Sequence, residues 1–291
     1  MAKKKSKFTS PRFRRKYIQL LSALIFNANL PGFASGTIYK ENIKGVCVPG
    51  LNCYSCPGAI AACPLGSLQA ALGEVKHKLP YYALGALLLF GVLLGRGVCA
   101  FLCPFGLIQE LLYKIPTPKL NKSKRTRRVS LLKYAVLMVF VLLLPLLFLA
   151  RDGVSVPAFC KYICPAGTLE GGLPLVLANA NLQAQAGALF VWKVGLLAVI
   201  VITSVFIYRT FCRFLCPLGA IYSLFNRIAL FGIKVDEHKC VNCDACVRSC
   251  KLDTKKINDR ECIRCGDCQP ACKYGAIYFC NKKEDKSCET K

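Results

Sequence analysis

The sequence predicts an all-α polytopic membrane domain of four transmembrane helices with an internal repeat, followed by a small α+β domain rich in cysteine. Three observations predict this class. Hydrophobic residues make up 54% of the 291 residues, and the mean hydropathy of +0.42 is too high for an ordinary soluble domain. Lys and Arg outnumber Asp and Glu by 40 to 15 and gather beside long apolar segments. The 20 cysteines, against two histidines, indicate metal sites, disulfides or both.

Four apolar segments are the candidate spans, at residues 17–30, 79–95, 134–150 and 188–208. The last two come close to the roughly 20 residues that a helix needs to cross a bilayer, and Lys193 is the one charged residue in them. The second, at 79–95, is shorter than the last and ends at Arg96, and the first is the shortest of the four. Residues 17–30 also fit a secretory signal peptide, because a basic start and a short apolar stretch precede the small residues at 33–36.

Two basic runs set the orientation. Residues 1–16 and 114–133 each hold eight Lys or Arg and no acidic residue. Under the positive-inside rule both runs are cytoplasmic, so both termini are cytoplasmic and residues 31–78 and 151–187 lie outside. The charge therefore indicates a multi-pass protein of the cytoplasmic membrane that contacts anionic lipids, with no nucleic acid as partner.

An internal repeat marks the cytoplasmic ends of two spans. Residues 96–106 and 209–219 share the pattern Arg-x-x-Cys-x-Phe-Leu-Cys-Pro-x-Gly. Cysteines at i and i+4 share a helix face, and the proline favours a bend into a new helix whose unpaired N–H groups can donate to sulfur. Two copies around a pseudo-twofold axis along the membrane normal supply four ligands for an inner cluster: Cys99, Cys103, Cys212 and Cys216. The alternatives are zinc and idle thiols.

The outer loops repeat a related element, since Cys63-Pro-Leu-Gly resembles Cys164-Pro-Ala-Gly. The expected ligands of an outer cluster are Cys56, Cys63, Cys160 and Cys164, with Cys53 as the alternative to Cys56. Disulfides are the competing interpretation, because an extracytoplasmic loop is where they form. Cys47 has no place in either arrangement.

The C-terminal region holds two copies of Cys-x-x-Cys-x-x-Cys-x-x-x-Cys, the run of a bacterial-type 2[4Fe-4S] ferredoxin. In such a pair the fourth cysteine of each run ligates the other cluster. Cluster 1 then takes Cys240, Cys243, Cys246 and Cys272, and cluster 2 takes Cys262, Cys265, Cys268 and Cys250. Lys251 and Lys273 stand where proline normally follows and are expected to favour reduction. Cys280 and Cys288 lie outside the pattern.

The chain therefore divides into four parts: a basic cytoplasmic N-terminus (1–16), a four-helix membrane domain (17–233), a ferredoxin-like domain (234–280) and a charged tail (281–291). The four spans, the Cys-x-x-x-Cys-Pro motifs and the two-cluster tail together resemble the NapH/NosR-type membrane polyferredoxins over residues 12–280, and are most similar to the shorter NapH type. The resemblance implies electron transfer between the quinone pool or cytoplasmic donors and extracytoplasmic redox proteins.

The sequence thus predicts an iron-sulfur electron-transfer component of an oxidoreductase system, with two to four [4Fe-4S] clusters, redox partner proteins on one or both faces, and quinone as a further partner. Spans of 17–20 residues are about 25–30 Å long, too long for fast tunnelling between clusters at opposite faces, so the sites dip inward or something lies between them. The alternatives are a maturation scaffold for a partner metalloenzyme and a quinol dehydrogenase subunit, with Glu110 as proton acceptor.

Overall fold

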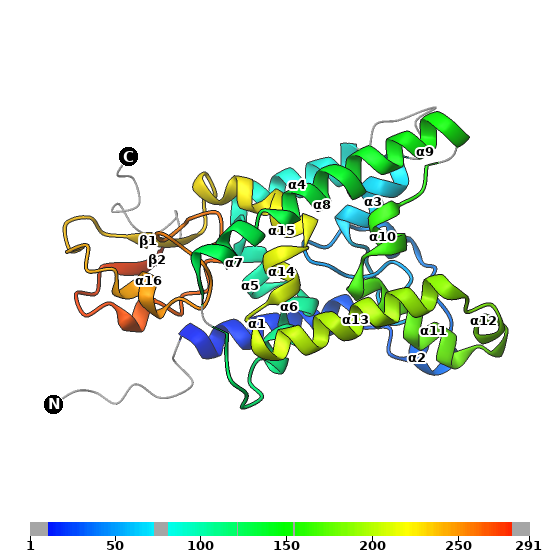
Figure 1. Cartoon of the computed structure of the whole chain (residues 1–291), viewed down its shortest axis with the longest axis horizontal. Coiled ribbons are helices and arrows are strands. Elements are labelled where there is room, and N and C mark those ends of the chain that lie inside the picture. The colour runs from blue at the N-terminus through cyan, green and yellow to red at the C-terminus, as the bar shows by residue number, and fades with distance from the viewer. Residues whose placement is uncertain (1–10, 73–80, 121, 154, 281–291) are drawn as a thin grey trace.

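The computed structural model describes residues 11–72, 81–120, 122–153 and 155–280. Residues 1–10 of the basic N-terminus, residues 79–80 of the second predicted span, and the charged tail with Cys288 lie outside the described residues. Within the described part helices dominate, and a small module with a two-stranded sheet lies at one end of the helical body (Figure 1).

Two of the described helices are long and apolar enough to cross a membrane. The first runs for 29 residues from Lys124 to Asp152 and comprises α7 (Lys124–Val129), α8 (Leu132–Val136), the π-helix η4 (Leu137–Leu143) and α9 (Leu144–Asp152). The second is α13 (Ala188–Phe206), with 19 residues. α4 (Tyr81–Leu94) is apolar but shorter, and α1 (Pro11–Phe26) carries a buried Arg15. Length and composition therefore support two of the four predicted spans.

The π-helical turn in the first long helix has a local cause. Pro145 has no N–H to donate to the carbonyl four residues earlier, and a wider turn just before it accommodates the missing bond. The same helix begins ahead of its apolar stretch because Ser123 and Thr126 form a capping box.

Each of the four Cys-Pro-x-Gly elements bends the chain into a new helix. Cys63, Cys103 and Cys216 have extended backbones and cap helices that start at the following proline. Those helices are α3 (Pro64–Ala71), α6 (Pro104–Leu112) and α15 (Pro217–Leu224). A helix also starts at Pro165 and continues through the π-helix η5 (Gly167–Gly172) into α11 (Leu173–Ala178). Short helices precede three of the elements: α5 (Gly97–Phe101), α10 (Ala158–Tyr162) and α14 (Thr210–Phe214).

The first outer loop folds into the helical body rather than away from it. A parallel bridge between Cys47 and Ala62 closes the loop at its base. A Cβ on Gly50 would lie 3.0 Å from the Cα of Cys103, so only glycine allows the loop to approach the inner motif this closely. The loop also contributes Leu51 and Cys63 to the hydrophobic core that contains the inner cysteines.

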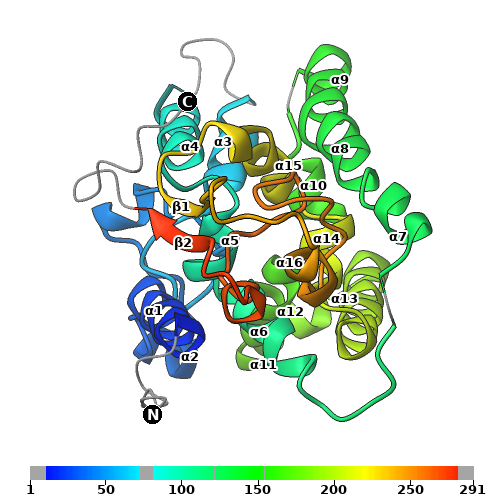
Figure 2. The ribbon, with the colours of Figure 1, turned by 90° about the vertical axis from the view of Figure 1, so that its left-hand side faces the viewer.

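The C-terminal module has an antiparallel pair of strands, β1 (Gly232–Val235) and β2 (Ile277–Cys280), with Gly232 opposite Cys280 and Val235 opposite Ile277. Between the strands lie α16 (Ala245–Ser249) and the 3-10 helix η7 (Gln269–Ala271). Figure 2 looks onto this module with the helical body behind it. The remaining elements are α2 (Pro31–Ser35), η2 (Asn42–Gly45), α12 (Ala180–Ala184) and η6 (Phe225–Arg227).

Candidate iron-sulfur sites

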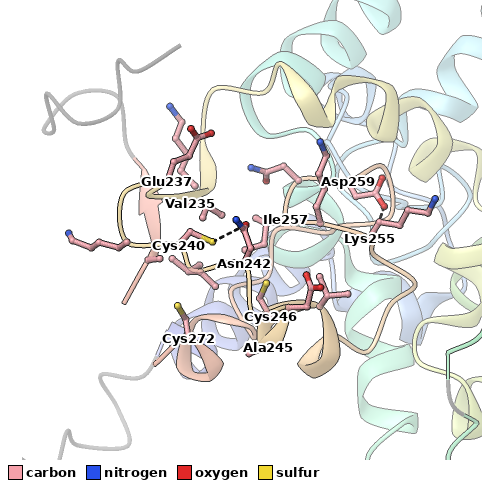
Figure 3. Close-up of a pocket in the computed structure, with 18 of the residues that line it drawn as sticks. Val235, Glu237, Cys240, Asn242, Ala245, Cys246, Lys255, Ile257, Asp259 and Cys272 are labelled. Carbon is pink, nitrogen blue, oxygen red and sulfur yellow. Dashed lines mark hydrogen bonds between the residues drawn. The ribbon is translucent and has the colours of Figure 1, made fainter. Parts of the chain in front are cut away.

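The outer end of the C-terminal module is hollowed around four thiols. A cavity of about 1460 Å³ is lined by Cys240, Cys243, Cys246 and Cys272, the four residues expected at cluster 1. Figure 3 labels three of them, Cys240, Cys246 and Cys272. Left-handed backbone at Asn242 and Asp244 turns the chain around this cavity. Arg264 and Gly266 have the same conformation at the corresponding positions of the second run, so both runs wrap in the same way.

The second four-thiol set of the module faces the helical body. The thiols of Cys250, Cys262 and Cys268 interact electrostatically, and Cys250 and Cys265 pack against a cluster formed by Ala100, Tyr208, Leu252 and Ile263. Ala100 belongs to α5, between the two inner cysteines of the first half. The cysteines expected at cluster 2 therefore lie next to the inner motifs, and those expected at cluster 1 lie farther out.

Buried ion pairs fix the module on the helical body. Glu261, 1% exposed, pairs with Arg96 at 3.0 Å and with Lys133 at 2.8 Å. Asp253 pairs with Arg213, and both side chains are buried. Since the acids belong to the module and the bases to the helical body, these pairs hold the module in one orientation.

The inner set is fully enclosed. Cys99, Cys103, Cys212 and Cys216 are each at most 6% exposed and lie in one hydrophobic core. Cys216 interacts electrostatically with all three others. Donors surround the sulfurs: the Gly219 N–H lies 3.3 Å from the Sγ of Cys216, and the Nε2 of Gln109 lies 3.1 Å from the Sγ of Cys212. The structure thus brings the four thiols of the internal repeat together, with N–H groups that suit thiolates.

The outer set gathers around a second cavity of about 670 Å³. Its lining includes Cys53, Cys63, Cys160 and Cys164, and does not include Cys56. A Cβ on Gly167 would lie 3.6 Å from the Sγ of Cys53 and 3.7 Å from that of Cys164, so these two sulfurs flank the same point. All six outer cysteines are free thiols in the structure.

Cys56, the expected fourth outer residue, lies elsewhere. A turn in which the Cys56 N–H donates to the Cys53 carbonyl at 3.0 Å directs the two side chains apart. The Sγ of Cys56 contacts the Oδ1 of Asn27 at 3.7 Å. Of the two candidates from the sequence, Cys53 lines the cavity and Cys56 does not. Cys47 contacts the hydroxyl of Ser67 and lines neither cavity.

Each of the four sets offers four cysteine thiols, the ligand type and number of a [4Fe-4S] cluster. Within the described residues, no group of three or more His, Cys, Asp or Glu side chains lies close enough to hold a metal ion. Burial and the nearby Glu170 raise the pKa of Cys53 to about 12, and burial raises the pKa of Cys160 to about 12. A bound cation would stabilise the ionised form of these thiols.

The inserted loop brings the inner and outer sets close to each other. Tyr222 is fully buried, and its hydroxyl donates to the carbonyl of Pro49 at 2.9 Å. Its side chain interacts electrostatically with Cys63 of the outer set and with Cys99, Cys103 and Cys216 of the inner set. Tyr222 and the loop at Pro49 therefore lie near thiols of both sets.

Glu110 is not available as the proton acceptor that the quinol dehydrogenase alternative requires. Its carboxylate accepts from Arg15 at 2.7 Å, from Arg209 at 2.7 Å and from the hydroxyl of Tyr208 at 2.5 Å. Burial alone would raise the pKa of Glu110, but Arg209 and Arg15 outweigh burial and lower it to about 2. The group stays ionised and paired near neutral pH, so its role is structural.

Comparison with known proteins agrees with this chemistry. A family model described as a 4Fe-4S binding domain matches residues 81–123, 134–173 and 188–236, which contain both inner motifs. An uncharacterized protein of Methanocaldococcus jannaschii is 30% identical over 196 residues, which cover 65% of this chain and 70% of that protein.

Two named relatives are similar over shorter parts of their length. The regulatory protein NosR of Stutzerimonas stutzeri is 30% identical over 170 residues, 55% of this chain and 21% of NosR. The methylamine utilization ferredoxin-type protein MauN of Paracoccus denitrificans is 30% identical over 173 residues, 57% of this chain and 53% of MauN. No solved structure matches the chain. With these relatives and the matched 4Fe-4S domain, the chain belongs to the NosR/NapH-type polyferredoxin family. It is an iron-sulfur electron-transfer protein.

Proposed function

We propose that this protein conducts electrons across the cytoplasmic membrane through four [4Fe-4S] clusters held in series. The series begins in the C-terminal module, at the set that contains Cys240, and continues to the module's other set, which contains Cys262. From there it runs to the inner set and ends at the outer set. Each cluster would accept and release one electron. The observation that carries the proposal is the continuous series of four-cysteine sets, in which Tyr222 and the inserted loop link the last two.

The ligand assignment follows the four sets. The proposed ligands are Cys240, Cys243, Cys246 and Cys272; Cys262, Cys265, Cys268 and Cys250; Cys99, Cys103, Cys212 and Cys216; and Cys53, Cys63, Cys160 and Cys164. The chain's own contribution is to fix these thiols and to exclude water from the inner set, which is buried in an apolar core. A dry, rigid site lowers the reorganisation that accompanies a change of charge.

The proposed topology has four spans with both termini in the cytoplasm. Exposed leucines on α1 and α4, among them Leu21 and Leu89, would face lipid. Alkaline phosphatase fused after residue 186 should be active and that fused after residue 120 inactive, because only the first would lie outside. The reverse pattern of phosphatase activity would place residues 151–187 in the cytoplasm and would refute this topology. Redox proteins on the two faces, with quinone as an alternative cytoplasmic-side partner, would deliver and remove the electrons.

Iron and acid-labile sulfide per chain, measured on protein purified without oxygen, test the proposal. We expect about 16 irons in the wild type and about four fewer when the four inner cysteines are replaced by serine. Cys53→Ser should also lose about four irons, whereas the matched Cys56→Ser should lose none. A wild type with only about eight irons would refute the series of four clusters and would indicate a membrane-bound ferredoxin with two.

A further inference from the structure

Two arginines occupy equivalent positions in the internal repeat. Arg96 and Arg209 each stand three residues before the first cysteine of an inner motif. They are 1% and 0% exposed, among the most buried large side chains of the described residues. A fully buried guanidinium is costly to desolvate, so two at matching positions call for a specific purpose.

The contacts of the two arginines cross between the halves. The Nη2 of Arg96 donates to the carbonyl of Cys212 at 3.2 Å, and the Nη1 of Arg209 donates to the carbonyl of Cys99 at 2.5 Å. Each guanidinium thus holds the first cysteine of the opposite motif. This reciprocal pattern is what a pseudo-twofold axis between the motifs produces, and it ties their backbones together at the inner set.

Each arginine also pairs with a buried carboxylate, which offsets part of its charge and holds the guanidinium in place. Arg96 pairs with Glu261 at 3.0 Å, and Arg209 pairs with Glu110 at 2.7 Å. Both arginines interact electrostatically with Cys99 and Cys212. Because one carboxylate belongs to the C-terminal module, the Arg96 pair also links the inner set to the docked module.

We propose that Arg96 and Arg209 form a crossed pair that positions the two inner motifs around their cluster and raises its reduction potential. They are positioning residues and do not ligate iron. Reduction adds negative charge, and two fixed cations in a water-free core favour the reduced state. The inference rests on the proposed inner cluster and adds the residues that set its geometry and potential.

The test compares charge removal with charge conservation. In Arg96→Gln and Arg209→Gln each carboxylate keeps a second cation, Lys133 for Glu261 and Arg15 for Glu110, which limits the risk of misfolding. The matched control is Arg151→Gln, which removes a charge at a side chain that is 86% exposed. Iron content and the midpoint potential of the inner cluster, followed by electron paramagnetic resonance during redox titration, are the readouts.

In each glutamine variant the equilibrium constant for reduction of the inner cluster should fall at least about tenfold, which lowers its midpoint potential by about 59 mV for one electron. A variant in which the inner motifs no longer hold the cluster should instead lack about four irons. Arg96→Lys and Arg209→Lys keep the charge and should shift the potential less, while Arg151→Gln should match the wild type. Full iron with an unchanged potential in both glutamine variants would overturn the inference alone. A wild type with only about eight irons would instead overturn the inner cluster on which it rests.

Discussion

One of the buried ion pairs that dock the C-terminal module, between Asp253 of the module and Arg213, the residue after Cys212, should contribute strongly to docking. Asp253 is 7% exposed and Arg213 is 2% exposed. The Oδ1 of Asp253 also accepts from the hydroxyl of Thr126 at 2.9 Å. Asp253→Asn keeps the shape and much of the hydrogen bonding but leaves the guanidinium buried without a countercharge.

The expected cost is about 3–5 kcal/mol, the usual penalty for removing one partner of a buried pair. This corresponds to about two to four powers of ten in the equilibrium between the docked and the undocked module. Backbone amide hydrogen exchange over residues 250–265, in detergent and without oxygen, measures that equilibrium directly, because undocking exposes these amides.

A matched variant separates the buried pair from charge in general. Asp236 pairs with Lys239 at 3.1 Å, and these side chains are 25% and 64% exposed. Asp236→Asn should therefore leave the docking equilibrium close to that of the wild type, because an exposed ion pair stabilises little. Equal exchange rates at residues 250–265 in the two variants would refute the view that the Asp253 pair fixes the module.

Three further predictions test other parts of the site. Glu110→Gln should destabilise the fold by about 3–5 kcal/mol. Burial raises the pKa of Glu110, but the two arginines outweigh it and lower the folded-state pKa to about 2. The difference in melting temperature between wild type and variant should therefore be constant above about pH 5 and shrink as the pH falls toward 2. Tyr222→Leu should slow reduction of the proposed outer cluster in freeze-quench experiments, while Tyr222→Phe, which keeps the ring, should not. Gly50→Val should cost about 1–3 kcal/mol in thermal unfolding by overpacking, because its Cβ would lie 3.0 Å from the Cα of Cys103; Gly45→Val, where nothing lies within 4 Å, is the control.

Local chemistry explains what the sequence could predict. Proline after Cys103 or Cys216 starts a helix because its ring disfavours helix at the residue before it, and the structure has the bend at each position. The spacing of the C-terminal run likewise picked out the four cysteines that line the larger cavity. Both inferences depend on a few neighbouring residues, so no knowledge of the tertiary fold was needed.

Tertiary packing explains what the sequence could not predict. Cys53 and Cys56 are three residues apart in the chain, and the turn that contains both, rather than their spacing, decides which one lines the cavity. The repeated arginines were visible in the motif, but their crossing depends on how the two halves pack. Glu110 on an amphipathic helix suggested an accessible acid, whereas Arg15, 95 residues away in the sequence, buries and neutralises it.

The inserted outer loop determines how far an electron would have to travel between the last two sets. A bilayer core is about 30 Å thick, and cofactors at its two surfaces would be separated by that distance. Here Gly50 places the loop against Cys103, and Tyr222 contacts the loop at Pro49 while lying beside thiols of both sets. The spacing between the inner and outer sets is therefore fixed by the packing of this loop and not by membrane thickness. It follows that changes to the loop, rather than changes to the length of α13, should alter the rate of electron exchange between the two sets.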